Sequence, residues 1–542
     1  MNAKKIIDRE AKLRGQRSNW ESHWEEIALR VLPRHSEIFQ TENFRSTNGQ
    51  KKTEEMFDSS AAIALERFAA VMESMLTPMH QTWHRIMPTD RSLMRDRATA
   101  LWFEDANRVL WMERKRSSAN FQSQQFESYM SLGAFGTGAK FIDHNPNGGL
   151  RYRANHLSEV VFDCNHQGII DTAYRKFKMT LRQVMQKYEA GLFQNVSEKV
   201  REKAEKNPDE EIDVVHCVRP REEVDPERAD YRGMPFASYY VDKTNSVTMD
   251  EGGYETFPYA ISRYVTAPGE IYGRSPAMTA LPAIKVLNEQ KKTMLKQGHR
   301  VVDPVLLAHD DGVLDTFSLK PGAINMGGVS KEGRALVQAL PTGNIAAGQE
   351  LMEMEKRVIN DVFLVSVFQV LIERRGQTPP TATEVLELAK EKGSLLSPTM
   401  GRQQSEDLGP TIEREVDILM AQDKLPELTP AMIEAEADFE VEYESPLSRA
   451  QRAEEASGLF RSIEFATAHA NVTQDPSAFD WIDIDKAMPA VMEINGVPAS
   501  WQKSMDDVLA LRENRNQQQQ VQQMIEAAPA AAGIMKAVGP GL

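Results

Sequence analysis

The chain has 542 residues, 41% of them hydrophobic and 26% charged, which is too long for one ordinary domain and enough for several hydrophobic cores. Its longest apolar run, Val362–Ile372, has 11 residues, whereas a membrane-spanning helix needs about 20. The N-terminus lacks the apolar core of a secretory signal, and Cys164 and Cys217 give no disulfide framework. We therefore expect a protein without membrane segments that is made in the cytoplasm.

The net charge of −15 is concentrated in one part of the chain. Residues 401–500 contain 21 acidic and 7 basic residues, which accounts for nearly the whole acidic excess. A protein that grips nucleic acid by its phosphates shows a basic patch instead. The charge pattern therefore argues against tight, static, sequence-independent DNA binding, although it leaves weaker DNA contact open.

Helical and strand-like segments follow one another in the first half of the chain. Apolar residues recur at helical spacing in five segments: 3–32, 57–76, 96–116, 120–132 and 181–206. Short alternating runs with Gly and Asn breaks predict strands within 135–180, and further strands at 214–218 and 237–247. We expect an α+β fold that is mainly helical.

Two long predicted helices in the middle of the chain bracket a short non-helical segment. Ser275 and Pro276 form a good helix start, a hydroxyl cap followed by proline, for a helix over 275–302. The second helix is predicted over 344–373. The intervening residues 303–343 are rich in Gly and Pro and contain only short β-prone pieces. This arrangement suits a stem with a tip, which belongs in an assembly rather than around an active site.

The second half of the later helix, VFLVSVFQVLI, is apolar all round and must be buried on every side. A lone monomer has difficulty covering such a helix, whereas a ring of copies supplies neighbours. We expect the following side chains to pack between subunits: Val362, Phe363, Val367, Phe368 and Leu371.

A loop with Arg374, Arg375, Gly376 and Gln377 follows this helix, and its arginines admit two interpretations. As cations at a helix C-terminus they offset the helix dipole. In a projecting loop they present guanidinium groups to a phosphate backbone. Further along, the glutamine-rich and Ala/Gly/Pro-rich tail is either a projecting helix or disordered.

Several motif-like patterns do not indicate enzyme chemistry. GAFGTGAK (Gly133–Lys140) misplaces the lysine of a phosphate loop and lacks the following hydroxyl residue, so a tight helix-to-strand turn fits better. Cys164 with His166, and His216 with Cys217, lack the paired spacing of zinc sites. No serine-hydrolase, metalloprotease or dinucleotide motif occurs. We expect no catalytic residues, no cofactor and no metal.

The order and spacing of several segments carry a resemblance to a known family. In chain order they are WESHWEEIALRVLP (20–33), MFDSSAAIALERFAAVMESMLTP (56–78) with Trp83, SSANF (117–121), LGAFGTG (132–138), YGRSP (272–276), ALPAIKVLNEQ (280–290), TATEV (381–385), LLSPTMGRQQSEDLGPTIERE (395–415) and YESPLSRAQR (443–452). From about residue 14 to residue 452, the chain resembles the head-to-tail connector, or portal, proteins of short-tailed bacteriophages.

The resemblance implies a protein without enzymatic activity that forms a ring, usually of twelve subunits, at one capsid vertex of the virion. Double-stranded DNA would pass through the ring during packaging and ejection. The implied partners are the terminase large subunit, a tail adaptor protein, and the major capsid and scaffold proteins. Synthesis in the host cytoplasm would precede assembly.

The resemblance also assigns parts to the chain. The wing would comprise 1–274 and 382–500, the stem the helices 275–302 and 344–373, the clip 303–343, the tunnel loop 374–381, and the crown or barrel, or a disordered tail, 501–542. The clip would dock partners through Asp310, Asp311, Lys331, Glu332 and Arg334. The tunnel loop would present Arg374, Arg375, Gly376 and Gln377 to the DNA channel.

Two other classes of protein remain open at this point. A DNA-handling ATPase or nuclease of a phage is one alternative, and the missing phosphate loop speaks against the ATPase. A tail adaptor or scaffold protein is the other, and it would be much shorter or would lack the helix–tip–helix order.

Overall fold

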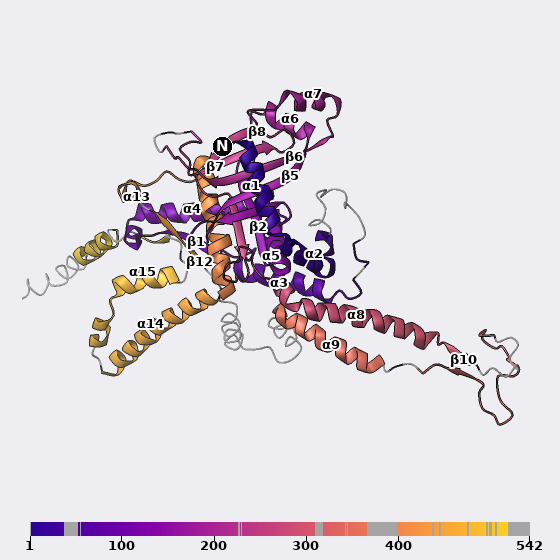
Figure 1. The fold of residues 1–542 in the computed structure, drawn as a ribbon. Coiled ribbons are helices and arrows are strands. Elements are labelled where there is room, and N and C mark those ends of the chain that lie inside the picture. Colours follow the sequence, from indigo (N-terminus) through magenta and orange to yellow (C-terminus); the bar gives the residue numbers. More distant parts are fainter. Residues whose placement is uncertain are drawn as a thin grey trace, which may run out of the picture. The chain divides into compact units, whose positions relative to one another are not determined.

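The computed structural model describes residues 2–36, 52–308, 318–365 and 398–518, apart from gaps of one to three residues at 55, 226–227, 229, 342, 344, 436–437, 444–445, 474–475, 495–496, 498–500 and 504–506 (Figure 1). The chain divides into two compact units. The first comprises residues 1–80 and 115–418, and the second comprises residues 81–114 and 419–542. Both contain helices and strands, so the expected α+β class is confirmed.

The larger sheet of the first unit has five antiparallel strands in the order β4-β5-β6-β7-β8. Their bounds are Val160–Cys164, Ile170–Thr180, Glu211–Pro220, Phe236–Asp242 and Val247–Tyr254. Helix α1 (Ala3–Gln16) covers one face, and α6 (Leu181–Glu189) with α7 (Glu198–Lys206) covers the other. Strand β6 shows the alternation expected of a strand, because Val215 packs with α1 and Val214 packs with α6 and α7.

The smaller sheet has the order β3-β2-β9, with β2 at Thr137–His144, β3 at Leu150–Asn155 and β9 at Tyr259–Arg263. Helix α5 (Phe121–Phe135) leads directly into β2. Gly136 caps this helix in the left-handed region, with φ of 78°, where glycine is favoured. The prediction of a helix-to-strand turn at GAFGTGAK is therefore confirmed.

The predicted helix over 3–32 is wrong in one respect, because the structure has two helices there. α1 is followed by α2 (Ser18–Val31), and Arg17 between them leaves the helical region. The Arg17 side chain is buried and donates hydrogen bonds from its guanidinium group to the carbonyl oxygens of Val160 and Ser158. These bonds satisfy a buried charged group at the expense of helical continuity.

Three of the recognised sequence segments meet in one aromatic core. Trp24 on α2 is fully buried and donates from Nε1 to the carbonyl oxygen of Phe135 at 3.1 Å. The ring of Tyr272 packs against Trp24, with centroids 5.2 Å apart, and against Phe162, with centroids 4.5 Å apart. This core joins the N-terminal helices, the α5–β2 turn and the residues that precede α8 (Pro276–Val302).

The first unit contains several further helical segments. These are η1 (Pro33–His35), α3 (Ser60–Leu76), α9 (Ile345–Val362), the π-helical segment η4 (Gln404–Leu408) and the start of α12 (Gly409–Ala421). Segment η4 is fixed to the smaller sheet by ion pairs. Glu406 binds Arg263 of β9 at 2.7 Å, and Asp407 binds Lys140 of β2 at 3.0 Å.

The second unit is built around the antiparallel pair of β1 (His84–Pro88) and β12 (Phe439–Tyr443). Its helices are η2 (Arg91–Arg95), α4 (Arg97–Lys115), α13 (Pro430–Glu434), α14 (Pro446–Thr473), η5 (Pro476–Trp481) and α15 (Ile484–Ile494). Trp102 on α4 donates from Nε1 to the carbonyl oxygen of Pro426 at 2.9 Å. This bond joins two segments that are far apart in the sequence.

Candidate functional site

The two long helices in the middle of the chain form a hairpin that extends away from the sheets of the first unit (Figure 1). Helix α8 begins where the sequence predicts, because the Ser275 hydroxyl accepts a hydrogen bond from the Met278 backbone N–H at 3.0 Å and Pro276 occupies the first helical position. It continues through Pro282 to Val302, a length of 27 residues or about 40 Å.

Helix α9 returns alongside α8. Gly348 packs against the Met294 side chain of α8, and a Cβ atom there would lie only 2.4 Å from the Met294 sulfur, so a larger residue would require that side chain to move. Only Met352 and Ile359 of α9 are buried, and no residue from Glu289 to Val302 in α8 is buried. The outer part of the hairpin therefore has little core of its own.

Apolar side chains are exposed along both helices of the hairpin. Six of them have between 44% and 61% of their surface accessible: Val286, Leu295, Val301, Leu351, Met354 and Val358. Isolated exposed apolar residues are common on protein surfaces. A set of this size on a two-helix projection instead indicates a surface that another chain covers.

The two helices also differ in charge. Helix α8 carries five Lys or Arg residues and one Glu, whereas α9 carries four Asp or Glu residues and two Lys or Arg residues. Lys296 on α8 and Glu350 on α9 are both exposed, and neither forms an ion pair within the described part of the chain. The hairpin thus presents one basic helix and one acidic helix.

The tip of the hairpin contains a short antiparallel pair, β10 (Leu306–Ala308) with β11 (Val337–Ala339). These strands coincide with the two β-prone pieces of the sequence. The described part of the tip is largely exposed, including the large apolar residues Leu319, Ile324 and Met326. The predicted docking residues Lys331, Glu332 and Arg334 are exposed here as well.

The apolar run after α9 differs from its prediction where the structure describes it. Helix α9 ends at Val362, and Leu364 has φ of 59°, which interrupts the helix expected over 344–373. Val362 is half-buried. Phe363 is fully buried and its ring lies 6.3 Å from that of Phe68. Phe363 is therefore covered by its own chain, which corrects the expectation that a neighbouring subunit must cover it.

The other predicted site residues lie outside the described residues. They are Asp310 and Asp311 of the clip, Val367, Phe368 and Leu371 of the apolar run, and Arg374, Arg375, Gly376 and Gln377 of the tunnel loop.

The residues of the rejected motifs have structural partners. Lys140 of GAFGTGAK is completely buried and bound to Asp407. His216 uses both ring nitrogens, with Nδ1 3.0 Å from the Tyr259 hydroxyl and Nε2 3.0 Å from the Ser238 hydroxyl. Among the residues that the structure describes, no group of three or more His, Cys, Asp or Glu side chains is placed to hold a metal ion.

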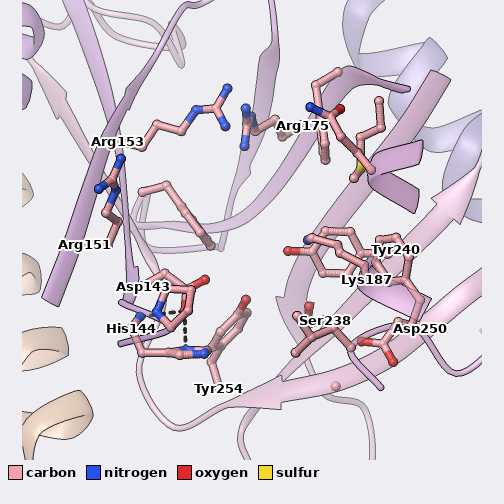
Figure 2. Close-up of a pocket in the computed structure, with 18 of the residues that line it drawn as sticks. Asp143, His144, Arg151, Arg153, Arg175, Lys187, Ser238, Tyr240, Asp250 and Tyr254 are labelled. Carbon is pink, nitrogen blue, oxygen red and sulfur yellow. Dashed lines mark hydrogen bonds and ion pairs between the residues drawn. The ribbon is translucent and has the colours of Figure 1, made fainter. Parts of the chain in front are cut away.

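The first unit also contains a cleft of about 1190 Å³ that the sequence did not indicate (Figure 2). Strands β2, β3, β5, β7 and β8 and helix α6 contribute to its walls. Its charged lining includes Arg153, Arg175, Lys187, Asp143 and Asp250. These residues come from separate segments of the chain and have no common spacing, so no sequence pattern identifies them.

The hairpin of α8, the exposed tip and α9 is the most distinctive part of the chain. The similarity of the chain to known proteins is not limited to this hairpin. The family described as "Bacteriophage head to tail connecting protein" matches residues 3–501. The chain belongs to this family. The resemblance inferred from the sequence is therefore confirmed.

Two relatives match nearly their whole length. The chain is 26% identical over 533 residues to a "Portal protein" of Salmonella phage epsilon15, covering 97% of this chain and 94% of the relative. It is 26% identical over 536 residues to a "Probable portal protein" of Bordetella phage BPP-1, covering 96% of this chain and 92% of the relative. These matches support a phage portal role for the chain and a place in the virion at the capsid. No helix among the described residues is both long enough and apolar enough to span a membrane.

Proposed function

We propose that this chain forms a closed ring, of about twelve copies, that acts as the channel for genome packaging and ejection and has no enzymatic activity of its own. The observation that carries the proposal is the α8–α9 hairpin, which exposes large apolar side chains together with Lys296 and Glu350, two charged residues that form no ion pair within the described part of one copy. The basic helix of one subunit would face the acidic helix of the next. A contact between two different surfaces can continue from copy to copy, and it gives a ring when the rotation between neighbouring copies closes.

The acidic balance of the chain suits a channel for DNA. The net charge is −15 per copy, and a ring multiplies it. Like charge keeps a polyanion from adhering to a channel wall. Weak contact and easy sliding are the properties that a packaging channel needs.

Charge-reversal variants of the hairpin, alone and in combination, test whether the hairpin holds the ring together. Lys296→Glu or Glu350→Lys alone should lower the ring fraction, measured by light-scattering mass at low micromolar concentration, because each places like charges across the contact between copies. Mixing the two variants, or combining the changes in one chain, should restore rings in part. Lys199→Glu on α7, an exposed site outside the hairpin, is the matched control.

A stable monomer of the unchanged protein would contradict the ring. An equal loss of ring from Lys199→Glu would show that net charge, and not the hairpin surface, controls association.

We further propose that residues 303–343 are the clip, where the terminase large subunit docks during packaging and the tail adaptor docks afterwards. Its support is the position of β10 and β11 at the far end of the hairpin (Figure 1) and the exposure of Lys331, Glu332 and Arg334. Replacing residues 312–331 by a short Gly/Ser linker should leave rings intact and abolish packaging. Packaging at the level of the unchanged protein would exclude the clip as the docking site.

The wing and crown assignments, contacts with major capsid and scaffold proteins, and synthesis in the host cytoplasm belong to the same proposal, and the family membership of the chain supports them. The competing ATPase is tested directly. Purified rings should release no phosphate from ATP above the background of a buffer control, and hydrolysis that copurifies with the ring would favour the enzyme.

A further inference from the structure

The cleft of Figure 2 lies in the first unit, between edge strand β3 of the smaller sheet and the β5-β7-β8 side of the larger sheet. Its two ends differ in chemistry. Arg153 and Arg175 lie at one end, and Lys187, Tyr240 and Asp250 lie at the other (Figure 2).

Arg175 on β5 is a buried guanidinium with an unused donor. The side chain is about 95% buried, since only 5% of its surface is accessible. Its Nε donates to Glu159 Oε2 at 2.9 Å, and the ring of Phe177 lies 4.5 Å from its guanidinium carbon. Its Nη2 is buried without a hydrogen-bond partner among the described residues. Leaving such a charged donor unbonded costs free energy, so this atom indicates a place for an acceptor.

Arg153 on β3 completes the arrangement from the opposite wall. It forms no hydrogen bond or ion pair with any described residue, and its guanidinium group is directed toward that of Arg175 (Figure 2). Desolvation and the positive charge of Arg175 both lower the pKa of Arg153. Two cations that face one another repel, and an anion between them would remove the repulsion and bond the unused donors.

The rest of the cleft favours a carboxylate on a peptide over a nucleic acid. Asp143 and Asp250 line the same cleft and would repel the closely spaced phosphates of a nucleic-acid strand. The walls also contain the aromatic rings of Phe141 and Tyr254, which can hold an apolar side chain next to the acidic one. The volume of about 1190 Å³ exceeds the range of about 300–1,000 Å³ for small-molecule pockets, as a chain segment requires.

We propose that this cleft docks an extended acidic peptide segment of a partner protein, with one carboxylate held between Arg153 and Arg175 and a neighbouring apolar side chain on the aromatic wall. Both guanidinium groups present planar forks that match a carboxylate. Lys187, whose ammonium lies 4.9 Å from the ring centres of Phe193 and Tyr240 and has no ion pair among the described residues, is available for a second acidic residue.

Peptide binding to the full-length chain tests the site. The probe is a blocked, fluorescein-labelled hexapeptide in which glutamate alternates with leucine or phenylalanine, followed by fluorescence anisotropy. Arg153→Gln should weaken binding about tenfold or more, because a charged hydrogen-bond pair is lost. Arg153→Lys, which keeps the charge but not the fork, should weaken it less. Arg182→Gln, an exposed arginine that does not line the cleft, should leave binding unchanged.

Three results would overturn the proposal. The first is no anisotropy change with the unchanged protein, and the second is equal binding by Arg153→Gln. The third is tighter binding of a six-nucleotide thymidine strand than of the peptide, together with weaker binding of that strand by Arg153→Gln. This result would assign the cleft to a nucleic acid. Replacing the glutamates of the peptide by glutamines should reproduce the loss seen in Arg153→Gln and supports the carboxylate contact if it does.

Discussion

Gly136 and Gly273 lie with their backbones in such close contact that neither position has room for a side chain. A Cβ atom on Gly136 would come 2.2 Å from the carbonyl oxygen of Gly273, and a Cβ atom on Gly273 would come 2.1 Å from that of Gly136. Thr137 secures the contact, because its hydroxyl accepts a hydrogen bond from the Gly273 N–H at 2.9 Å. The two glycines belong to LGAFGTG and YGRSP, so this contact fixes the start of α8 against the end of α5.

We predict that Gly273→Ala lowers the unfolding temperature by several degrees. The added methyl group would press on a backbone carbonyl that has no room to move, and such overpacking costs about 1–3 kcal/mol or more. Gly15→Ala is the control, because a Cβ atom there meets nothing within 4 Å and alanine is favoured inside a helix. The unfolding temperature should fall in Gly273→Ala and rise in Gly15→Ala. A neutral Gly273→Ala would show that the contact is looser than described.

We predict that the buried ion pair between Asp407 and Lys140 is important for the stability of the fold. The Lys140 and Asp407 side chains are 0% and 1% exposed, and Gln125 donates to the second Asp407 oxygen at 2.6 Å. Asp407→Ala would leave an unpaired buried ammonium, which typically costs about 3–5 kcal/mol. We expect a large fall in the urea midpoint of the unfolding transition that includes α5 and β2.

The matched control for Asp407 is an exposed pair. Arg91 and Glu440 are about half exposed and 2.8 Å apart, and exposed pairs contribute at most about 1 kcal/mol. Glu440→Ala should therefore change the urea midpoint little. Equal effects from the two substitutions would contradict the difference that burial is expected to make.

We predict that buried His216 makes the folded protein less stable in acid. The pKa of His216 is lowered to about 3, mainly by burial and also by the positive charges of Arg175 and Lys187, while Asp143 opposes them. An unfolded histidine has a pKa of about 6.5. Between pH 6.5 and 3 the unfolded chain therefore takes up a proton that the folded chain does not, and stability falls as the pH falls, by about 1.4 kcal/mol per pH unit for one proton.

The test compares the unfolding temperature from pH 7 to pH 4 in His216→Gln and in the unchanged protein. Glutamine keeps a donor and an acceptor near Tyr259 and Ser238, and it does not titrate. The acid slope should be shallower in the variant. The same substitution at exposed His166 should leave the slope as it was, and a slope unchanged by His216→Gln would exclude a contribution from this histidine.

The sequence predicted the start of α8 and the strands at the tip of the hairpin, because those features depend on local signals, whereas it did not predict the end of α9 at Val362. The Ser275–Pro276 start is one example, and the β-prone pieces VLL (305–307) and ALVQAL (335–340), which overlap strands β10 and β11, are another. The break at Arg17 was missed, since the helical pattern of α1 and α2 continues through it and only bonds to Val160 and Ser158 explain it. Local periodicity does not contain such long-range bonds.

The cleft could not be predicted for a related reason. The two arginines that face one another lie on β3 and β5, in different sheets, and only the fold brings them together. Arg153 belongs to a strand whose alternating pattern is the same as that of a strand with one face in solvent. The unbonded Nη2 of Arg175 can be identified only when the positions of its neighbours are known. Charge on a strand indicates exposure, whereas an unpaired buried donor indicates a ligand.

The last prediction concerns Arg374 and Arg375, which lie beyond the described end of the apolar run. From the sequence we expect Gly376 to allow a sharp turn after them and Pro379 and Pro380 to restrict the chain that follows. We propose that these arginines project into the channel as rare cations on an acidic path. Exposed ion pairs are worth at most about 1 kcal/mol, so each phosphate contact would be weak and exchangeable, which suits a clamp that holds packaged DNA without stalling it.

We therefore expect Arg374→Ala with Arg375→Ala to form rings normally and to package DNA that then leaks out. The measurements are ring fraction by light scattering, unfolding temperature, and DNA retained per filled particle, all on one preparation. If the arginines only offset a helix dipole, the double variant should unfold at a lower temperature and retain DNA as the unchanged protein does. Lys331→Ala with Arg334→Ala on the exposed tip removes the same charge elsewhere, so leakage from that control as well would assign the effect to total charge and not to the loop.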